Sequence, residues 1–150
     1  MSETIEVSIN SKFDCVDTVS SLTRSLAEKI TFDEDSTGWI DLAVREAVIS
    51  AIKHGNKNLE GKKVDIKFIL ENDSFTVFIR DRGEGFDPAN LPDPLDPVNL
   101  LNPAGRGIFF MRTFMDEVEY STHPEGGSIV RMLKHRPLKD PNKEKADVSA

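Results

Sequence analysis

With 150 residues, 38% of them hydrophobic and 30% charged, the chain is long enough for one globular domain with a real core but too short for two. Its formal net charge of −7 argues against a general nucleic-acid binder, which needs a basic face, and leaves room for a basic protein partner. The chain has a single cysteine, and its first ten residues contain neither a basic segment nor an apolar leader. No apolar run approaches the ~20 residues that a membrane span needs. These features predict a cytoplasmic protein with no membrane association.

The first half of the chain predicts a strand followed by two helices. Apolar residues alternate with polar ones from Thr4 to Ile9, which is typical of a half-buried strand. From Val16 to Ile30 the apolar residues recur every three or four positions, which predicts a helix with Asp14 as its N-cap. A longer helix is expected from about Asp35 to Lys57, with Gly55 well placed to end it.

The second half predicts four strands and one helix. Residues 64–70 and 75–79 both alternate and are separated by a polar turn, so they predict an antiparallel hairpin. A proline-rich stretch follows that cannot be a regular element; its prolines are Pro88, Pro92, Pro94, Pro97 and Pro103. The remaining expected elements are a helix from about Gly107 to Met115 and strands from Val118 to Ser121 and from Ser128 to Lys134.

This order of elements predicts the fold class. Helices and strands are clustered rather than strictly alternating, which favours a two-layer α/β sandwich with the helices on one face of a mixed sheet over a doubly wound parallel fold. We expect one domain over residues 1–136. The tail, residues 137–150, is charged and without apolar periodicity, so we expect it to be disordered.

Two glycine-containing stretches suggest ligand contacts. Asp81 ends a predicted strand ahead of Gly83 and Gly85. On its own this pattern is more often a tight turn, but it also suits a carboxylate that accepts a hydrogen bond from an exocyclic amine while a flat ring lies against glycine. Gly105 and Gly107 lead into a predicted helix, where free amides bind anions. Arg106 between them adds a cation, and the chain has no GxxxxGK[ST] sequence, so a Walker-type loop is excluded.

The long predicted helix carries a third feature at Glu46. A helical glutamate is usually solvated, but Glu46 stands on a largely apolar helix, where it is a candidate general base. Ser50 lies one turn later on the same face, where an oxygen ligand for Mg²⁺ could sit.

The order and spacing of these residues resemble the ATP-binding module shared by gyrase, histidine kinases and heat-shock chaperones, the GHKL or Bergerat fold. The resemblance covers about residues 4–135 and is carried by Glu46-x-x-x-Ser50-x-x-x-His54-Gly55, Asp81-x-Gly83-x-Gly85, Gly105-x-Gly107 and Gly127-Ser128. Within that superfamily the chain is most similar to bacterial anti-sigma factors that are also serine-protein kinases. Histidine kinases fit less well, because nothing in the chain supplies a phospho-accepting histidine on a separate dimerisation helix.

The resemblance implies roles for individual residues. Glu46 would be the general base, and Asp81 would bind the adenine amine in a pocket shaped by Gly83 and Gly85. The segment Phe86 to Ala104 would be a lid over the phosphates. The remaining residues expected at the ATP site are Gly105, Arg106, Gly107, Ser128 and His54. His54 also suits a structural or surface role at its helix end, as do His123 and His135 in a turn and at a strand end.

Ser50 departs from the family pattern, which has a Mg²⁺-binding asparagine there. Serine is shorter, although a water could fill the gap because Mg²⁺ usually keeps several waters. If nothing filled it, the lost contact would be worth ~1.5–3 kcal/mol. Two functions therefore stay open. One is a kinase that binds Mg-ATP, phosphorylates an anti-anti-sigma protein and sequesters a sigma factor, acting as a homodimer through its N-terminal strand and first helix. The other is a nucleotide- or partner-binding module of the same fold with weak or no kinase activity.

Overall fold

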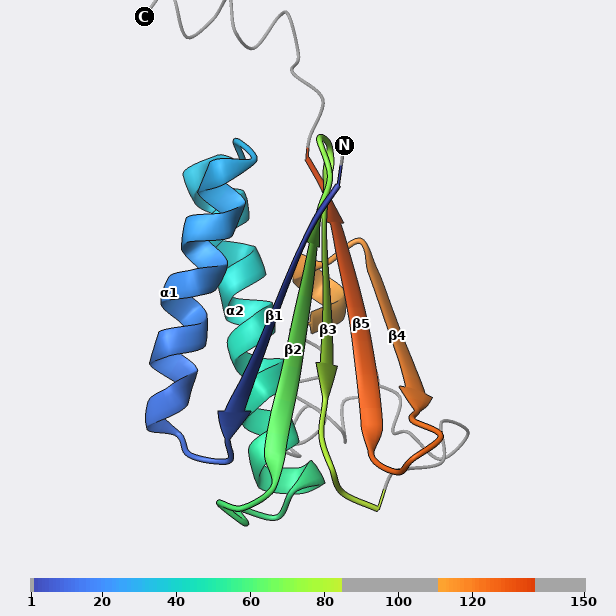
Figure 1. The fold of residues 1–150 in the computed structure, drawn as a ribbon. Helices are drawn as coiled ribbons and strands as arrows, with labels where there is room; N and C mark the ends of the chain where they lie inside the picture. Colours follow the sequence, from blue (N-terminus) through green and yellow to red (C-terminus); the bar gives the residue numbers. More distant parts are fainter. Residues whose placement is uncertain (1, 85–110, 137–150) are drawn as a thin grey trace, which may run out of the picture.

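The computed structural model describes residues 2–84 and 111–136. The fold has two layers. One layer is a five-stranded sheet, and the other consists of two long helices that pack on one face of this sheet (Figure 1). The two-layer α/β fold is therefore confirmed. In chain order the elements are β1 (Glu3–Asn10), α1 (Asp14–Lys29), α2 (Glu34–Ser50), the π-helical turn η1 (Ala51–Gly55), β2 (Lys63–Leu70), β3 (Ser74–Arg80), β4 (Glu117–Thr122) and β5 (Ser128–His135).

All four strand pairs of the described sheet are antiparallel, in the order β1-β2-β3-β5-β4, whereas a mixed sheet was expected. The physical reason lies in the connections. A single crossover helix between β1 and β2 would have made them parallel. Here the antiparallel helices α1 and α2 together return the chain to the end of the sheet that β1 reached, so β2 runs back beside β1 (Figure 1). The hairpin β2–β3 is antiparallel as predicted.

Alternation along the strands builds the core. β2 buries every second residue, so Val64, Ile66 and Phe68 face the helices while the residues between them are half-buried. Helix α2 supplies the other half of the core through its buried residues Ile40, Ala43, Val44, Ala47 and Val48. Full burial of one large side chain stabilises the fold by about 1.5–3 kcal/mol. No helix among the residues that the structure describes is long and apolar enough to span a membrane.

Polar contacts fix α1 against α2 and set where α2 begins. The buried Asp41 carboxylate accepts hydrogen bonds from Ser20 Oγ at 2.6 Å and from Arg24 Nε at 2.8 Å. Asp33 caps α2, since its Oδ1 accepts from the backbone N–H of Ser36 at 2.7 Å. The expected cap of α1 was wrong, because Asp14 is the first helical residue and the preceding cap residue makes no side-chain hydrogen bond.

The end of the second helix differs from expectation in a way that matters for the site. It does end at Gly55, but its last five residues form a π-helical turn in which Asn56 N–H donates to Ala51 O at 2.8 Å. Such turns are rare and often stand at functional sites. The turn buries Asn56 completely, and its amide oxygen accepts from Arg82 N–H at 2.7 Å. Its amide nitrogen donates to Ser11 Oγ at 2.9 Å and Lys63 O at 3.1 Å, so Asn56 joins three loops at one end of the sheet.

Several predicted features lie outside the described residues: the proline-rich lid from Phe86 to Ala104, the first part of the helix expected at Gly107 to Met115, and the tail 137–150. Residues 111–114 are helical, which agrees with the last part of that predicted helix.

Candidate functional site

The Asp81 carboxylate is held by the backbone of two different segments. It is buried directly after β3, and its Oδ1 accepts from Gly83 N–H at 2.8 Å and from Ser128 N–H at 3.1 Å. A further backbone bond, Asp81 N–H to Ser128 O at 3.0 Å, fixes the end of β3 against the start of β5. No described residue donates to Oδ2. One carboxylate oxygen is therefore fixed by the fold, and the other has no donor among the described residues.

Three glycines allow the backbone to approach this carboxylate. A Cβ on Gly55 would lie 2.2 Å from Asp81 Oδ2, and a Cβ on Gly83 would lie 2.1 Å from Gly55 O. Gly127 has φ +93°, and a Cβ there would lie 2.0 Å from Asp81 O. Any larger residue at these positions would push the η1 end, the β3 end and the β4–β5 turn apart.

A slot of about 50 Å³ lies beside Asp81, between α2 and the inner face of the sheet. Ligand pockets usually measure ~300–1,000 Å³, so this slot corresponds to one end of a nucleotide site rather than to the whole of it. Asp81, Ser50 and Ser128 supply polar groups to its lining, and most of the other lining residues are apolar in type: Ala47, Ala51, Ile79, Met111, Tyr120, Ile129 and Val130. An apolar slot ending in one available carboxylate oxygen suits the amine-bearing edge of a flat heterocycle.

Tyr120 and Met111 close one side of the slot. The Tyr120 hydroxyl donates to Met111 Sδ at 3.7 Å. Burial raises the pKa of Tyr120 well above its ordinary value of 10.0, and the Arg112 guanidinium opposes this only in part. Tyr120 is therefore uncharged at neutral pH and contributes an apolar ring wall with a hydroxyl donor.

Glu46 and Ser50 lie on α2, one helical turn apart, and both are half-buried. Ser50 lines the slot together with Asp81, so α2 and β3 bring two residues from the predicted site together. The Glu46 side chain makes no hydrogen bond or ion pair with another described residue, which leaves its carboxylate available. His54 is exposed on η1 and is not a lining residue of the slot.

Four of the predicted ATP-site residues, Gly85, Gly105, Arg106 and Gly107, lie outside the described residues. The residues that are described fit the base of a nucleotide, because Asp81 offers an acceptor at the end of an apolar slot. Fewer of the described side chains are suited to binding Mg²⁺. The described residues contain no group of three or more His, Cys, Asp or Glu side chains that could hold a metal ion. Ser50 and Glu46 on α2 are the described residues that the sequence places beside the metal.

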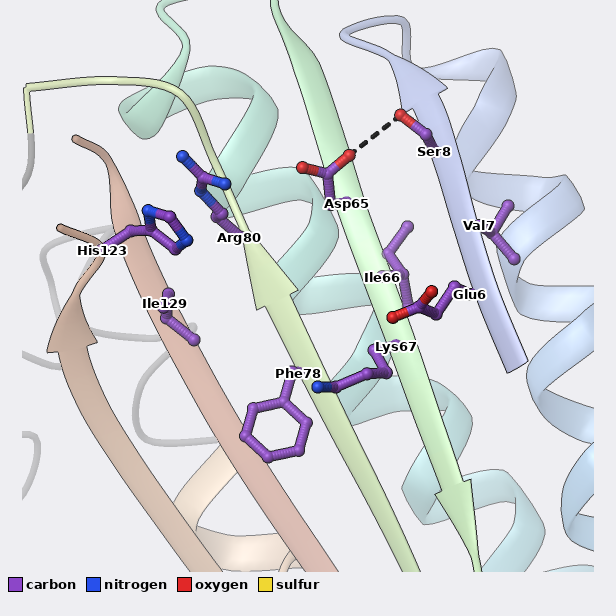
Figure 2. A pocket seen from close by; sticks show the side chains of 10 residues that line it. All are labelled: Glu6, Val7, Ser8, Asp65, Ile66, Lys67, Phe78, Arg80, His123 and Ile129. Carbon is purple, nitrogen blue, oxygen red and sulfur yellow. Dashed lines mark hydrogen bonds between the residues drawn. The ribbon is translucent and has the colours of Figure 1, made fainter. Parts of the chain in front are cut away.

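A larger hollow, of about 490 Å³, lies on the opposite face of the sheet (Figure 2). Successive strand residues point to opposite faces, so Arg80 lines this hollow whereas Asp81 lines the slot. Its carboxylate Asp65 is already bound by Ser8 Oγ at 2.9 Å and paired with Arg82. The Lys67 ammonium lies 4.9 Å from the centre of the Phe78 ring. Among its polar lining residues Ser8 and Asp65 bond to each other, and Arg80 donates to Gly126 O at 3.2 Å while its Nε has no hydrogen-bond partner among the described residues. The slot is preferred because it brings together Asp81, Ser50 and Ser128, which the sequence places at one site.

The sequence reasoning did not single out Asn56, Met111 or Tyr120. Asn56 follows the glycine that ends the helix, and its complete burial has no signal in apolar periodicity. Tyr120 and Met111 line the slot from segments that are far from Asp81 in the sequence, so only the folded chain places them there.

Comparisons with known proteins agree with this geometry. The family model described as "Histidine kinase-like ATPase domain" matches residues 9–134. The serine-protein kinase RsbW of Bacillus subtilis (strain 168) is 28% identical over 137 residues, which cover 87% of this chain and 84% of the relative. The anti-sigma F factor of Thermoanaerobacter sp. (strain X514) is 38% identical over 98 residues, which cover 64% of this chain and 68% of the relative.

A solved structure supports the fold. The crystal structure of the RsbU and RsbW domains of a Mycobacterium tuberculosis protein superposes with a TM-score of 0.65 at 16% identity. The match covers 91% of this chain and 34% of that one, so the chain spans about a third of the length of that neighbour.

The contact between Gly55 and Asp81 gives the first prediction. In Gly55→Ala the new Cβ has no room beside Asp81 Oδ2, so the carboxylate must move. We expect affinity for a fluorescent ATP analogue to fall about tenfold or more, and the free energy of unfolding to fall by about 1–3 kcal/mol. Gly61→Ala is the matched control, because a Cβ there meets nothing within 4 Å. Equal analogue affinity in the two variants would contradict a role for Asp81 in base recognition.

Proposed function

We propose that this chain, which belongs to the histidine kinase-like ATPase domain family, is a serine-protein kinase and anti-sigma factor. It binds Mg-ATP, phosphorylates a serine on an anti-anti-sigma protein and sequesters a sigma factor in the cytoplasm. Relatives named as a serine-protein kinase and as an anti-sigma factor support both halves of the proposal. The observation that carries it is the Asp81 carboxylate, fixed at Oδ1 and available at Oδ2, in one slot with Ser50.

Each residue has a role that follows from its position. Asp81 Oδ2 accepts a hydrogen bond from the amine of the base, and the Ser128 backbone N–H keeps that carboxylate oriented. Bound ATP supplies the phosphoryl group to be transferred. Glu46, half-buried and without a protein partner among the described residues, takes the proton from the hydroxyl of the acceptor serine. Ser50 places a hydroxyl one turn from Glu46, where a metal-bound water would find an acceptor.

The second candidate is a binding module of the same fold with weak or no kinase activity. Ser50 favours it, because a hydroxyl is shorter than the amide that this family usually offers to the metal. The two candidates share nucleotide binding and differ in whether phosphate reaches the partner.

We also propose that the chain forms a homodimer through β1 and α1. β1 is an edge strand of the described sheet and pairs only with β2, so its outer edge offers backbone groups to a second chain. Static light scattering of the purified chain should give twice the monomer mass of 16.8 kDa. A monomer mass at all concentrations would contradict this pairing.

The role of Glu46 is tested by Glu46→Gln, which keeps the side-chain shape and removes the base. Phosphoserine formation on a purified anti-anti-sigma protein, followed by mass spectrometry, should slow by about 10²–10⁴-fold. Affinity for the ATP analogue should stay within a few-fold, because Glu46 does not line the slot.

Glu71→Gln in the exposed turn between β2 and β3 is the matched control and should phosphorylate at the wild-type rate. If the wild-type chain binds nucleotide but leaves no phosphoserine on the partner, the binding-module candidate replaces the kinase. If Glu46→Gln phosphorylates as fast as wild type, Glu46 is not the base.

The metal contact is tested by Ser50→Asn. An amide oxygen at this position reaches further than the serine hydroxyl, and a gained contact to a charged group is worth about 1.5–3 kcal/mol. We therefore expect the Mg²⁺ concentration that gives half-maximal phosphorylation to fall by about tenfold or more. Analogue binding without Mg²⁺ serves as the control and should change little. An unchanged Mg²⁺ requirement would mean that Ser50 with a bridging water already serves as well as an amide.

A further inference from the structure

Two of the exposed apolar side chains lie on the same helix as the proposed base. Four large hydrophobic residues of the described chain are exposed: Phe13 by 53%, Trp39 by 44%, Leu42 by 37% and Leu59 by 54%. Phe13 and Leu59 lie in connections, before α1 and between η1 and β2. Trp39 and Leu42 lie within α2, in which the remaining apolar residues are buried or half-buried.

Their spacing places them in line with the proposed chemistry. Trp39, Leu42, Glu46 and Ser50 follow one another at intervals of three, four and four residues, so they occupy one stripe of α2. At 1.5 Å rise per residue, Leu42 lies about 6 Å and Trp39 about 10 Å along the axis from Glu46. The stripe therefore leads away from the base on the exposed side of the helix.

Trp39 is held in place although it is exposed. Its ring stacks on Phe114 with centroids 6.3 Å apart and an interplanar angle of 18°. The Lys134 ammonium lies 5.4 Å from the Trp39 ring centre and donates to Phe114 O at 2.9 Å. The Trp39 side chain is nevertheless 44% exposed. A fixed and exposed aromatic ring is a typical anchor point of a protein interface, since little side-chain entropy is lost on binding.

We propose that Trp39 and Leu42 form the docking surface for the protein that carries the acceptor serine, with an apolar side chain near that serine packing on both. The proposal rests on the kinase function proposed above. The proposal is based on proximity. When the acceptor serine reaches Glu46, the protein surface around that serine lies over Leu42, which is one turn away, and over Trp39 beyond it. The surface carries no unpaired cation among these residues, because Lys134 is engaged by Phe114 and by Asp116 at 4.0 Å. An apolar contact therefore fits it better than an acidic one.

A second copy of the chain is the other occupant to consider. Trp39 is tied to Phe114 and to Lys134 of β5, whereas the proposed dimer contact is formed by α1 and by β1, which lies three strands from β5 in the sheet. Two anchoring side chains also form only a small contact, which suits a substrate that must leave after each turnover.

The test compares Trp39→Ala and Leu42→Ala with the matched controls Phe13→Ala and Leu59→Ala in the full chain. Phosphorylation of the purified anti-anti-sigma protein gives KM and kcat, titration with the ATP analogue gives nucleotide affinity, and thermal melting checks folding. We expect KM for the protein to rise about tenfold or more in the two stripe variants, with nucleotide affinity within twofold of wild type. The controls should keep the wild-type KM. Leu42→Ala leaves the Trp39 stack intact, so it keeps the test valid if Trp39→Ala melts early.

The chain has one tryptophan, Trp39, so its fluorescence reports on the stripe directly. Titration of wild type with the anti-anti-sigma protein should change that emission, and Leu42→Ala should weaken the binding it reports. This readout separates the two proposals. If wild type shows the fluorescence change but no phosphorylation, docking stands and the kinase fails. If wild type phosphorylates while both stripe variants keep the wild-type KM, docking fails and the kinase stands.

Two further outcomes would overturn the docking proposal. An equal loss of nucleotide affinity in the stripe variants would show that they disturb the nucleotide site instead. A fall from dimer to monomer mass in light scattering of the stripe variants would assign the surface to a second copy of the chain.

Discussion

The carboxylate of Asp81 is where three parts of the fold meet. Its Oδ1 binds the backbone of Gly83 and of Ser128, and Gly55 approaches so closely that no side chain fits between. The end of β3, the start of β5 and the end of the second helix are therefore positioned by one side chain. Because the fold itself occupies Oδ1, the orientation of Oδ2 is set before any ligand arrives. A ligand donor then meets an acceptor that loses little freedom on binding, which is the physical meaning of a preorganised site.

The π-helical turn makes this arrangement possible. Five residues of wider winding carry Gly55 against Asp81 and turn Asn56 inward. There its side-chain amide donates to the Ser11 hydroxyl and to the Lys63 carbonyl, and accepts from the Arg82 backbone N–H. A buried amide left without partners would cost about 1–3 kcal/mol for each unsatisfied group. Asn56 thus couples the helix end to the strand end that carries Asp81, and α2 itself carries Ser50 into the same slot. In the proposed function, α2 and η1 would therefore link the residue for base recognition to the residues for catalysis.

The sequence predicted the elements better than it predicted their ends. The alternating residues of β2 and β3 and the three-to-four spacing of α1 and α2 predicted these strands and helices, and the elements are confirmed. Burial alternates along β2, whereas the first four residues of β3 are all buried. The π-helical turn stayed hidden because five residues are too few to shift an apolar period. Asp14 was wrongly chosen as a cap because the acidic residue stands inside the helix, whereas Asp33 is the residue that bonds to a free amide.

Asp81, Ser50 and Ser128 were expected at one site from the family resemblance, and they do line one slot. Tyr120 and Met111 could not be foreseen, because contacts between distant segments leave no local pattern. The roles of Glu46 and Ser50 in catalysis remain proposals that rest on position.

The placement of α2 also explains how one helix can serve two kinds of recognition. Its inner face is packed against the sheet by residues with essentially no exposure, so the helix is fixed in place and cannot adapt to a ligand. In the proposed function the slot residues would read the nucleotide by shape and by one acceptor, while Trp39 and Leu42 would meet the partner. Such a division would separate the two specificities, because neither Trp39 nor Leu42 lines the slot. Under these proposals a relative of this chain would change partners through exposed residues such as Trp39 and Leu42 and keep the same nucleotide chemistry, because these two residues do not line the slot.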